Sequence, residues 1–373
     1  MNLNGKGLEE WLDNNSPEVD GRKLLIDSYK HFKNVLHELH KEVTKGATLE
    51  NILSKKGEPG FEFDKVIWLN DHGPKHIQTV IERASQLVKS APLEITPREV
   101  YILLCAIQLH DIGNYLGRNG HEKRITEVLN SDTNIVGFDA VERSYIVKTA
   151  QMHGGKVLID GEEDKNTISQ LKQVVTIQGN EIRQRLLASI VRFADELADD
   201  SDRADKRLLI DNRLPKSSEV FHAFSFCLDT IKVDFSTHTI KLHFKVPVAF
   251  LSRTFGKISK DEKTINDVYL IDEIYSRTLK MHFERVYCAK FWKSDIPIEK
   301  IWAEIEFYYF NPDEAKKFEL HPDITFHIHE EYYPSDSIDI FKICPDLKYK
   351  DGSQMNGENI RKKIEQHVAK ESV

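Results

Sequence analysis

Four histidines and two aspartates are the residues of this chain whose types and positions best suit chemistry. They are His76, His110, Asp111, His121, His153 and Asp195. Each stands near the end of a helix that the sequence predicts or on the buried face of one, where unneutralised imidazoles and carboxylates would be costly. Mixed histidine and carboxylate ligation with open positions suits iron, manganese, cobalt, nickel or zinc better than calcium. The pattern therefore predicts a water-activating centre with one or two divalent transition-metal ions, whose identity stays open.

Apolar residues at helical spacing predict the elements that position these side chains. A helix that begins after Gly73 holds His76 near its start. The segment Thr96-Pro97-Arg98-Glu99 combines an N-cap threonine, a proline at the first helical position and a glutamate three residues after the cap, so it predicts a well-defined helix start. The helix that follows is apolar on nearly all sides and ends at His110-Asp111. We therefore expect it to carry this doublet into the protein interior.

Three further helices are predicted to carry the remaining candidates. One begins at His121, after the glycine-rich stretch 117–120. Another spans about residues 139–151 and is followed by His153. The third spans residues 182–197 and places Asp195 on the same face as two core aliphatic side chains, where a carboxylate needs a partner.

The residues after Arg213 change from helical spacing to alternation of apolar and polar side chains. Residues 231–235 and 240–246 alternate on either side of a short turn, which predicts a hairpin. Residues 264–291 have a helical pattern, and residues 301–309 alternate again. We therefore expect a mainly α protein, in which a helical domain over 1–212 precedes a small α+β domain over 213–347 and a loose polar tail over 348–373. The α+β domain could form a dimer surface, cover the site or stabilise the first domain.

Composition and charge limit the function classes. A formal net charge of −8 over 373 residues repels polyanions, so it argues against a general DNA or RNA coat and favours a compact substrate. The four cysteines lie singly among apolar residues and are typical of reduced thiols in a cytosolic protein. The N-terminal residues lack the pattern of a signal or transit peptide, and no apolar run approaches the roughly 20 residues that cross a bilayer. We expect a cytoplasmic protein without membrane contact.

The order His76, His110-Asp111, Asp195 resembles the HD-domain metal-dependent phosphohydrolase superfamily, an all-helical fold, over about residues 71–203. The run Leu109-His110-Asp111-Ile112-Gly113-Asn114 is the most specific part of the resemblance. It implies that His76, His110, Asp111 and Asp195 bind one metal ion. His121 and His153 match the extra histidines of members with two metals, in which the aspartate of the doublet, here Asp111, bridges the pair.

Two other motifs resemble those of one subgroup of this superfamily. Asp71-His72-Gly73 and the run from Arg192 to Leu197 resemble the subgroup that also occurs fused to Hsp90-like ATPase modules. Ala198 stands where that subgroup would have an aspartate, and the chain has no such ATPase module, so the function of the subgroup transfers poorly. No Gly-Tyr-Pro follows His153, which argues against the cyclic-di-GMP phosphodiesterase branch.

The resemblance implies hydrolysis of a phosphoester or phosphoanhydride bond by metal-activated water, as in phosphohydrolases and phosphodiesterases. We expect three catalytic residues. Asp111 would hold the metal, and the cationic side chains of Lys75 and Arg124 would act on the phosphoryl group. Four further residues near the ligands are candidates for substrate binding: His72, Arg118, Lys123 and Lys156. We expect a nucleotide-like small molecule as the substrate. The alternatives are a nuclease for single-stranded nucleic acid ends and a non-catalytic nucleotide-sensing module, and the α+β domain could form a homo-oligomer.

Overall fold

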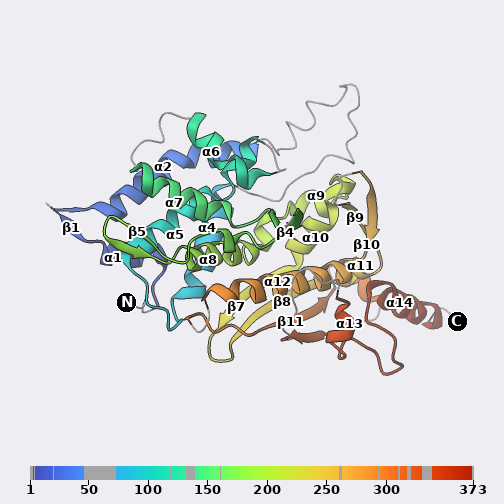
Figure 1. Cartoon of the computed structure of the whole chain (residues 1–373). Coiled ribbons are helices and arrows are strands. Elements are labelled where there is room, and N and C mark those ends of the chain that lie inside the picture. The colour runs from blue at the N-terminus through green and yellow to red at the C-terminus, as the bar shows by residue number, and fades with distance from the viewer. Residues whose placement is uncertain are drawn as a thin grey trace, which may run out of the picture. The chain divides into compact units, whose positions relative to one another are not determined.

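The computed structural model of the chain describes residues 3, 5–19, 21–45, 73–116, 120–131, 139–159, 161–259, 263–292, 295–309, 311–316, 321–329 and 338–371. The fold is mainly α with an α+β part, as the sequence predicts (Figure 1). The chain divides into two compact units. The helical unit comprises Met1–Ala47, Asp71–Ala198 and Cys288–Pro297, and the sheet unit comprises Thr48–Asn70, Asp199–Tyr287 and Ile298–Val373. None of the helices in the described part of the chain is long and apolar enough to cross a membrane.

Helix α5 forms the centre of the helical unit. The helices of this unit are α1 (Leu8–Asn15), α2 (Leu24–Lys45), α4 (Pro74–Val88), α5 (Pro97–Leu109), α6 (His121–Ser131), α7 (Ala140–Gln151) and α8 (Gln184–Glu196). Every residue of α5 from Glu99 onward is buried, because α1, α2, α4, α7 and α8 all pack against it. The predicted capping box is confirmed, since the Thr96 side chain accepts from the Glu99 amide and the Glu99 side chain accepts from the Thr96 amide.

Short elements connect these helices. The 3-10 helix η2 (Ile112–Leu116) follows α5 directly, and a second one, η3 (Ile168–Gln170), precedes α8. Three two-stranded hairpins complete the described part of the unit: β1 (Glu18–Val19) with β2 (Arg22–Lys23), β3 (Val157–Ile159) with β4 (Glu162–Asp164), and β5 (Val175–Ile177) with β6 (Asn180–Ile182). Asp139 caps α7 by accepting from the amides of Val141 and Glu142.

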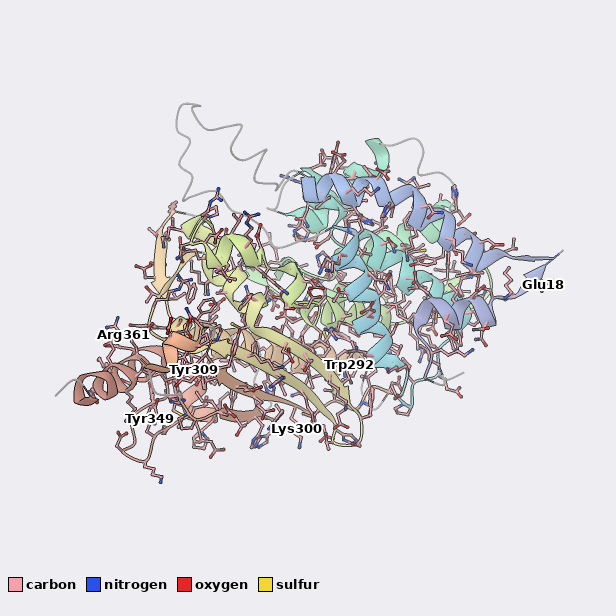
Figure 2. All side chains as sticks on the ribbon, turned by 180° about the vertical axis from the view of Figure 1, so that it is seen from behind. Glu18, Trp292, Lys300, Tyr309, Tyr349 and Arg361 are labelled. Atoms are coloured by element: carbon pink, nitrogen blue, oxygen red, sulfur yellow. The ribbon has the colours of Figure 1, made fainter. Side chains whose placement is uncertain are left out.

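A four-stranded sheet organises the sheet unit. Its strands are β7 (Leu228–Asp234), β8 (Thr239–Pro247), β11 (Lys300–Tyr308) and β12 (Ile324–Ile328), in the order β12-β11-β8-β7. β7 and β8 form the predicted antiparallel hairpin, β8 and β11 run parallel from the pair Thr239 and Lys300 onward, and β11 and β12 are antiparallel. Buried and partly exposed residues alternate along β11, so one face of the sheet lies in the core. Figure 2 shows Lys300 and Tyr309 at opposite ends of this strand.

Helices and a small hairpin complete the sheet unit. They are α9 (Lys206–Ile210), α10 (Glu219–Cys227), α11 (Val248–Leu251), β9 (Phe255–Ile258), β10 (Ile265–Val268), α12 (Leu270–Trp292), α13 (Ile340–Ile343) and α14 (Gly357–Glu371), with the 3-10 helices η4 (Ser201–Arg203), η5 (Lys216–Ser218) and η7 (Pro312–Lys316). The Tyr275 ring of α12 contacts the Phe326 ring of β12 at 5.4 Å, so this helix packs on the sheet. The last residues of α12, from Cys288, belong to the helical unit.

Two expectations from the sequence are corrected here. Residues 265–268 were expected in a helix over 264–291, but they form strand β10, because they pair with β9 in an antiparallel register. The expectation of a loose tail beyond residue 348 is wrong for α14, in which Ile360 and Ile364 are buried (Figure 2 labels its Arg361). The domain boundaries at 212 and 347 stay predictions.

Candidate metal centre

The six candidate ligands lie at the ends of five helices of the helical unit. His76 is in the first turn of α4, and His121 is the first residue of α6. His110 caps the C-terminal end of α5 and is followed by Asp111. His153 lies two residues beyond α7, and Asp195 is in the last turn of α8. Three helices therefore present C-terminal ends to this region, and the partial negative charge of such ends favours a bound cation.

The first set of side chains that could hold a metal ion comprises His76, His110, Asp111 and Asp195, whose ligand atoms lie within 4.8 Å of one another. His76 Nε2 is 3.4 Å from Asp111 Oδ2 and 3.2 Å from Asp195 Oδ1. His110 Nε2 is 3.5 Å from each of the same two oxygens. Two imidazole nitrogens and two carboxylate oxygens thus face one common point.

The second set comprises Asp111, His121 and His153, again with ligand atoms within 4.8 Å of one another. His121 Nε2 lies 3.1 Å from Asp111 Oδ1 and 3.1 Å from His153 Nε2. His153 Nε2 lies 3.9 Å from the same Asp111 oxygen. Asp111 therefore belongs to both sets, with Oδ2 facing the first and Oδ1 facing the second.

Backbone carbonyls fix two of the imidazole rings. His110 Nδ1 donates to the Ile107 carbonyl at 2.8 Å, and His153 Nδ1 donates to the Ala150 carbonyl at 2.7 Å. Both acceptors lie three residues earlier, at helix ends whose last carbonyls need donors. Because a carbonyl only accepts, Nδ1 carries the proton in both rings, and in a neutral ring Nε2 keeps the lone pair that a metal ion requires.

The charges in the centre depend strongly on one another. Burial disfavours the charged form of His110, but the carboxylates of Asp111 and Asp195 outweigh it and raise the pKa of this imidazole to about 9. Burial and the neighbouring imidazoles of His110 and His121 lower the pKa of His153 to about 3. Burial alone would raise the pKa of Asp195, yet its contacts with His110 and His76 hold it well below the usual range. Asp195 is therefore a carboxylate at neutral pH.

The residues of both sets fit a divalent cation. The Nε2 atom of His110 is buried and lies 3.5 Å from oxygens of Asp111 and Asp195, which is long for a hydrogen bond and leaves this nitrogen poorly satisfied. Imidazole nitrogens and carboxylate oxygens are ligands that iron, manganese, cobalt, nickel and zinc all accept. A cation at these points would satisfy the nitrogen and neutralise the carboxylates together.

Access to the centre differs between its members. The side chains of His76, His110, Asp111 and His153 are at most 5% exposed. Asp195 is 29% exposed and His121 is 15% exposed. Water or a substrate would therefore reach the centre beside Asp195 and His121.

The cationic candidates lie near the ligands but differ in their contacts. Lys75 precedes His76 and is exposed, and Lys123 follows His121 by two residues and is also exposed. The Arg124 guanidinium donates to the Leu116 carbonyl at the end of η2. Lys156 forms an exposed ion pair with Glu163. His72 and Arg118 lie outside the described residues.

Sequence reasoning missed several residues that hold the centre in place. His40 of α2 is 3% exposed and donates from Nε2 to the Gln108 carbonyl at 2.8 Å, near the end of α5. The Gln108 amide donates to the Tyr29 hydroxyl, so α2 holds this helix end at two points. Burial lowers the pKa of His40 to about 4, which keeps the ring neutral. The helical pattern of α2 indicated packing, and only the polar types of His40 and Tyr29 on a buried face could have suggested more.

Glu122 is the other missed residue. It is 8% exposed, and its Oε2 atom lies 3.5 Å from His121 Nδ1. Two glycines allow the close packing here. A Cβ on Gly113 would collide with the His121 carbonyl, and one on Gly155 would lie 2.6 Å from Glu122 Oε1. The glycines were visible in the sequence, but their partners were not.

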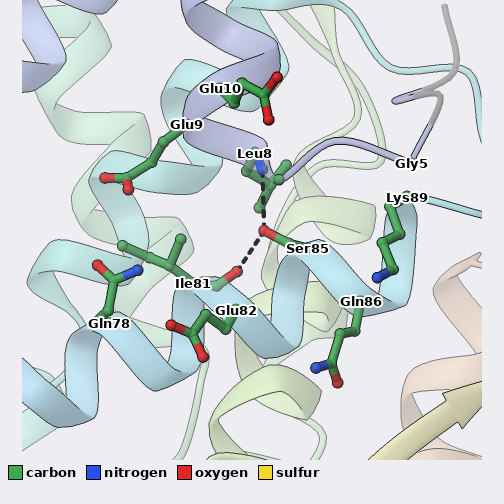
Figure 3. A pocket seen from close by; sticks show the side chains of 11 residues that line it. Gly5, Leu8, Glu9, Glu10, Gln78, Ile81, Glu82, Ser85, Gln86 and Lys89 are labelled. Carbon is green, nitrogen blue, oxygen red and sulfur yellow. Dashed lines mark hydrogen bonds between the residues drawn. The ribbon is translucent and has the colours of Figure 1, made fainter.

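A pocket of about 360 Å³ lies elsewhere in the helical unit, between α1 and α4 (Figure 3). The Ser85 hydroxyl at its wall accepts from the Leu8 amide and donates to the Ile81 carbonyl. Glu9, Glu10 and Glu82 also line the pocket. None of the six candidate ligands lines it, so it has no part in the metal centre.

Comparison with known families agrees with this geometry. The family model HD-CE matches residues 62–267, which is more than half of the chain and includes all six candidate ligands. The chain therefore belongs to the HD-CE family, an HD-type family. No curated protein and no solved structure matches the chain.

Proposed function

We propose that this protein is a metal-dependent phosphohydrolase that cleaves a phosphoester or phosphoanhydride bond in a nucleotide-like small molecule. One observation carries the proposal: the two oxygens of Asp111 face two different sets of potential ligands. A carboxylate in this position can bridge two cations. HD-type family membership is the second support.

Bound divalent ions would supply an activated water molecule and polarise a phosphoryl oxygen. The chain's own residues determine where this happens. Asp111 and Asp195 supply the negative charge that holds the cations, and the rings of His110 and His153 are aimed by backbone carbonyls. Because Asp195 and His121 are the more exposed members, the substrate would approach from their side.

The substrate class follows from charge and from helix ends. The N-terminal ends of α4 and α6 both lie at the centre, and such ends attract phosphate oxygens. Lys75 and Lys123 would add positive charge beside them. Arg118 and His72, which lie outside the described residues, stay proposed substrate-binding residues. Arg124 and Lys156 have partners in Leu116 and Glu163, so they would contribute only by exchanging those contacts for phosphate. The net charge of −8 favours a small nucleotide over a polynucleotide.

Further properties belong to the same proposal. The metal would be iron, manganese, cobalt, nickel or zinc, with one or two ions bound. The protein would act in the cytoplasm, without membrane contact, and its sheet unit could mediate self-association. The resemblance to the subgroup that is also fused to Hsp90-like ATPase modules would place it with that branch of the HD domains.

The test combines metal analysis with a substrate screen. Wild-type protein and Asp111→Ala would be compared for metal content and, by chromatography of the products, for hydrolysis of nucleoside mono-, di- and triphosphates and of cyclic and linear dinucleotides. Asp111→Ala should lose most of the bound metal and nearly all turnover, because both sets lose their shared carboxylate. Glu181→Gln, on an exposed residue of β6, is the matched control and should resemble wild type. Full metal content in Asp111→Ala would refute the proposal. Metal binding without turnover on any nucleotide class would favour a sensing module.

A further inference from the structure

The imidazoles of His110, His121 and His153, which surround Asp111, are anchored in two different ways. His110 and His153 donate from Nδ1 to backbone carbonyls three residues earlier. His121 is the first residue of α6, and its Nδ1 atom lies 3.5 Å from the carboxylate of Glu122. The ring that faces Asp111 Oδ1 at 3.1 Å is thus backed by a negative charge instead of a neutral carbonyl.

The Glu122 carboxylate is confined to this position. The residue is 8% exposed, and Gly155 lies directly against it. Any side chain at Gly155 would place its Cβ 2.6 Å from Glu122 Oε1, and the φ angle of +75° at Gly155 is itself one that glycine adopts readily. A buried carboxylate is retained at a cost unless it meets a donor or a positive charge, and His121 Nδ1 is the donor that lies beside it.

The two sets of potential ligands differ in their number of carboxylates. The first set has two carboxylates, Asp111 and Asp195, whereas the second set has Asp111 alone with His121 and His153. Glu122 adds a second negative charge behind the second set. A carboxylate that accepts from the outer nitrogen of a ligating imidazole fixes the ring orientation and strengthens the inner nitrogen as a ligand.

We propose that Glu122 is a positioning residue for a second metal ion: its carboxylate accepts a hydrogen bond from His121 Nδ1, aims Nε2 at the ion bridged by Asp111, and strengthens that one subsite. The inference rests on the proposed metal centre and adds a specific division of labour to it. Loss of Glu122 lowers the metal affinity of the second set, which comprises Asp111, His121 and His153. It leaves the metal affinity of the first set unchanged.

The experiment titrates metal-stripped full-length protein with Mn²⁺ alone and counts bound ions by electron paramagnetic resonance and calorimetry. Wild type should bind two ions. Glu122→Gln keeps an acceptor but loses the charge, so it should weaken one of the two sites about tenfold, and Glu122→Leu, which loses both, should weaken it about 100-fold. The other site should keep its affinity. Glu127→Gln, an exposed residue on the same helix, should change neither.

A His153→Gln background identifies the affected site. If Glu122 acts on the second set, Glu122→Gln should have no further effect once His153 is lost, and the remaining site should bind as in wild type. Thermal unfolding of the metal-free proteins separates positioning from stability. The Tm of metal-free Glu122→Gln should lie within about 2 °C of the wild-type Tm, because a change near zero in the free energy of unfolding shifts the Tm little.

Three results would overturn the inference. They are equal affinities in wild type and Glu122→Leu, an equal loss at both sites, and a fall in metal-free stability that matches the loss of binding. A wild-type protein that binds one ion, unaffected by Glu122→Gln, would also refute it while the proposed metal-dependent function stands. A wild-type protein that binds no Mn²⁺ and contains no other metal would instead refute the proposed function.

Discussion

The charges of one network in the sheet unit and those of the candidate metal centre are compensated in different ways. In the sheet unit, Arg277 donates to Glu273 at 2.9 Å and to Asp199 at 2.9 Å, and its guanidinium lies 4.3 Å from the centre of the Phe224 ring. Lys257 pairs with the same Glu273. In the metal centre of the helical unit, Asp111 and Asp195 face imidazoles, and His110 Nε2 lies 3.5 Å from an oxygen of each. Elsewhere in the same unit, Glu99 pairs with Arg183 and Glu142 with Arg98.

This difference separates a structural network from a candidate site. The sheet-unit network supplies each of its carboxylates with a permanent cation, and burial, which alone would raise the pKa of Glu273, is outweighed by Arg277 and Lys257. The metal centre has carboxylates and ligand nitrogens but no permanent cation of its own among the two sets. Buried charge alone is therefore a poor sign of function, whereas buried carboxylates that face only imidazoles are a better one.

Among single substitutions, the largest loss of stability is expected in the sheet-unit network. Arg277→Met removes the cation that Glu273 and Asp199 share. It should lower the free energy of unfolding by about 3 kcal/mol, the lower end of the range for broken buried pairs, because Arg277 is partly exposed and Lys257 and Arg203 stay beside the two carboxylates. Urea denaturation measures this. Metal content should stay at the wild-type value.

The matched control for Arg277→Met is Arg207→Met. Arg207 is 88% exposed and lies 3.9 Å from Asp211, so its loss should cost less than about 0.5 kcal/mol. Equal costs for the two variants would show that the sheet-unit network is no more than a surface ion pair, and the comparison between the units would fail.

The second prediction concerns the stability that bound Mn²⁺ adds through the metal centre. Mn²⁺ at 100 times its dissociation constant should stabilise the folded protein by about 2.7 kcal/mol for each ion, because the unfolded chain does not assemble the ligands. Thermal unfolding with and without Mn²⁺ measures the effect, and EDTA should reverse it. His110→Gln should remove the contribution of the first ion, and an undiminished shift in that variant would place the ion elsewhere.

The third and smallest effect is a pH dependence that distinguishes the two sets. In the metal-free protein His110 has a pKa of about 9, so it carries a proton at neutral pH that must leave before Nε2 can bind a metal ion. Affinity at the first set should therefore rise with pH, by up to about tenfold per unit, or about 1.4 kcal/mol, and level off above pH 9. His153, with a pKa of about 3, contributes no such proton.

Calorimetry in buffers of different ionisation enthalpy measures this proton release. About one proton should leave with the first ion at pH 7. An affinity that stays constant or falls between pH 6 and 9 would contradict the assignment of His110 to the first set.

The sequence predicted those parts of the fold that depend on local patterns. The capping box at Thr96 and Glu99 and the β7–β8 hairpin follow from side chains close in sequence. Strand β10 was missed because four residues carry too little periodicity, and only its pairing with β9 defines it. Helix α14 was missed because its composition is polar, although Ile360 and Ile364 find a place in the core.

In the candidate site too, the sequence predicted some residues and missed others. The sequence named six side chains that the structure brings together, because helix ends and residue types mark metal ligands. It did not place Glu122, because the packing of Gly155 that confines this carboxylate is a tertiary contact. It did not place His40 either, because contact between α2 and the end of α5 depends on tertiary packing.

We propose that Asp111 bridges two metal ions, and anomalous diffraction from crystals grown with Mn²⁺ would locate both. Two anomalous peaks should lie about 3.5–4 Å apart. One peak should lie among His76, His110 and Asp195, the other between His121 and His153, with Asp111 between them. Peaks confined to other parts of the chain, or an ordered Asp111 carboxylate without any peak beside it at saturating Mn²⁺, would contradict the account.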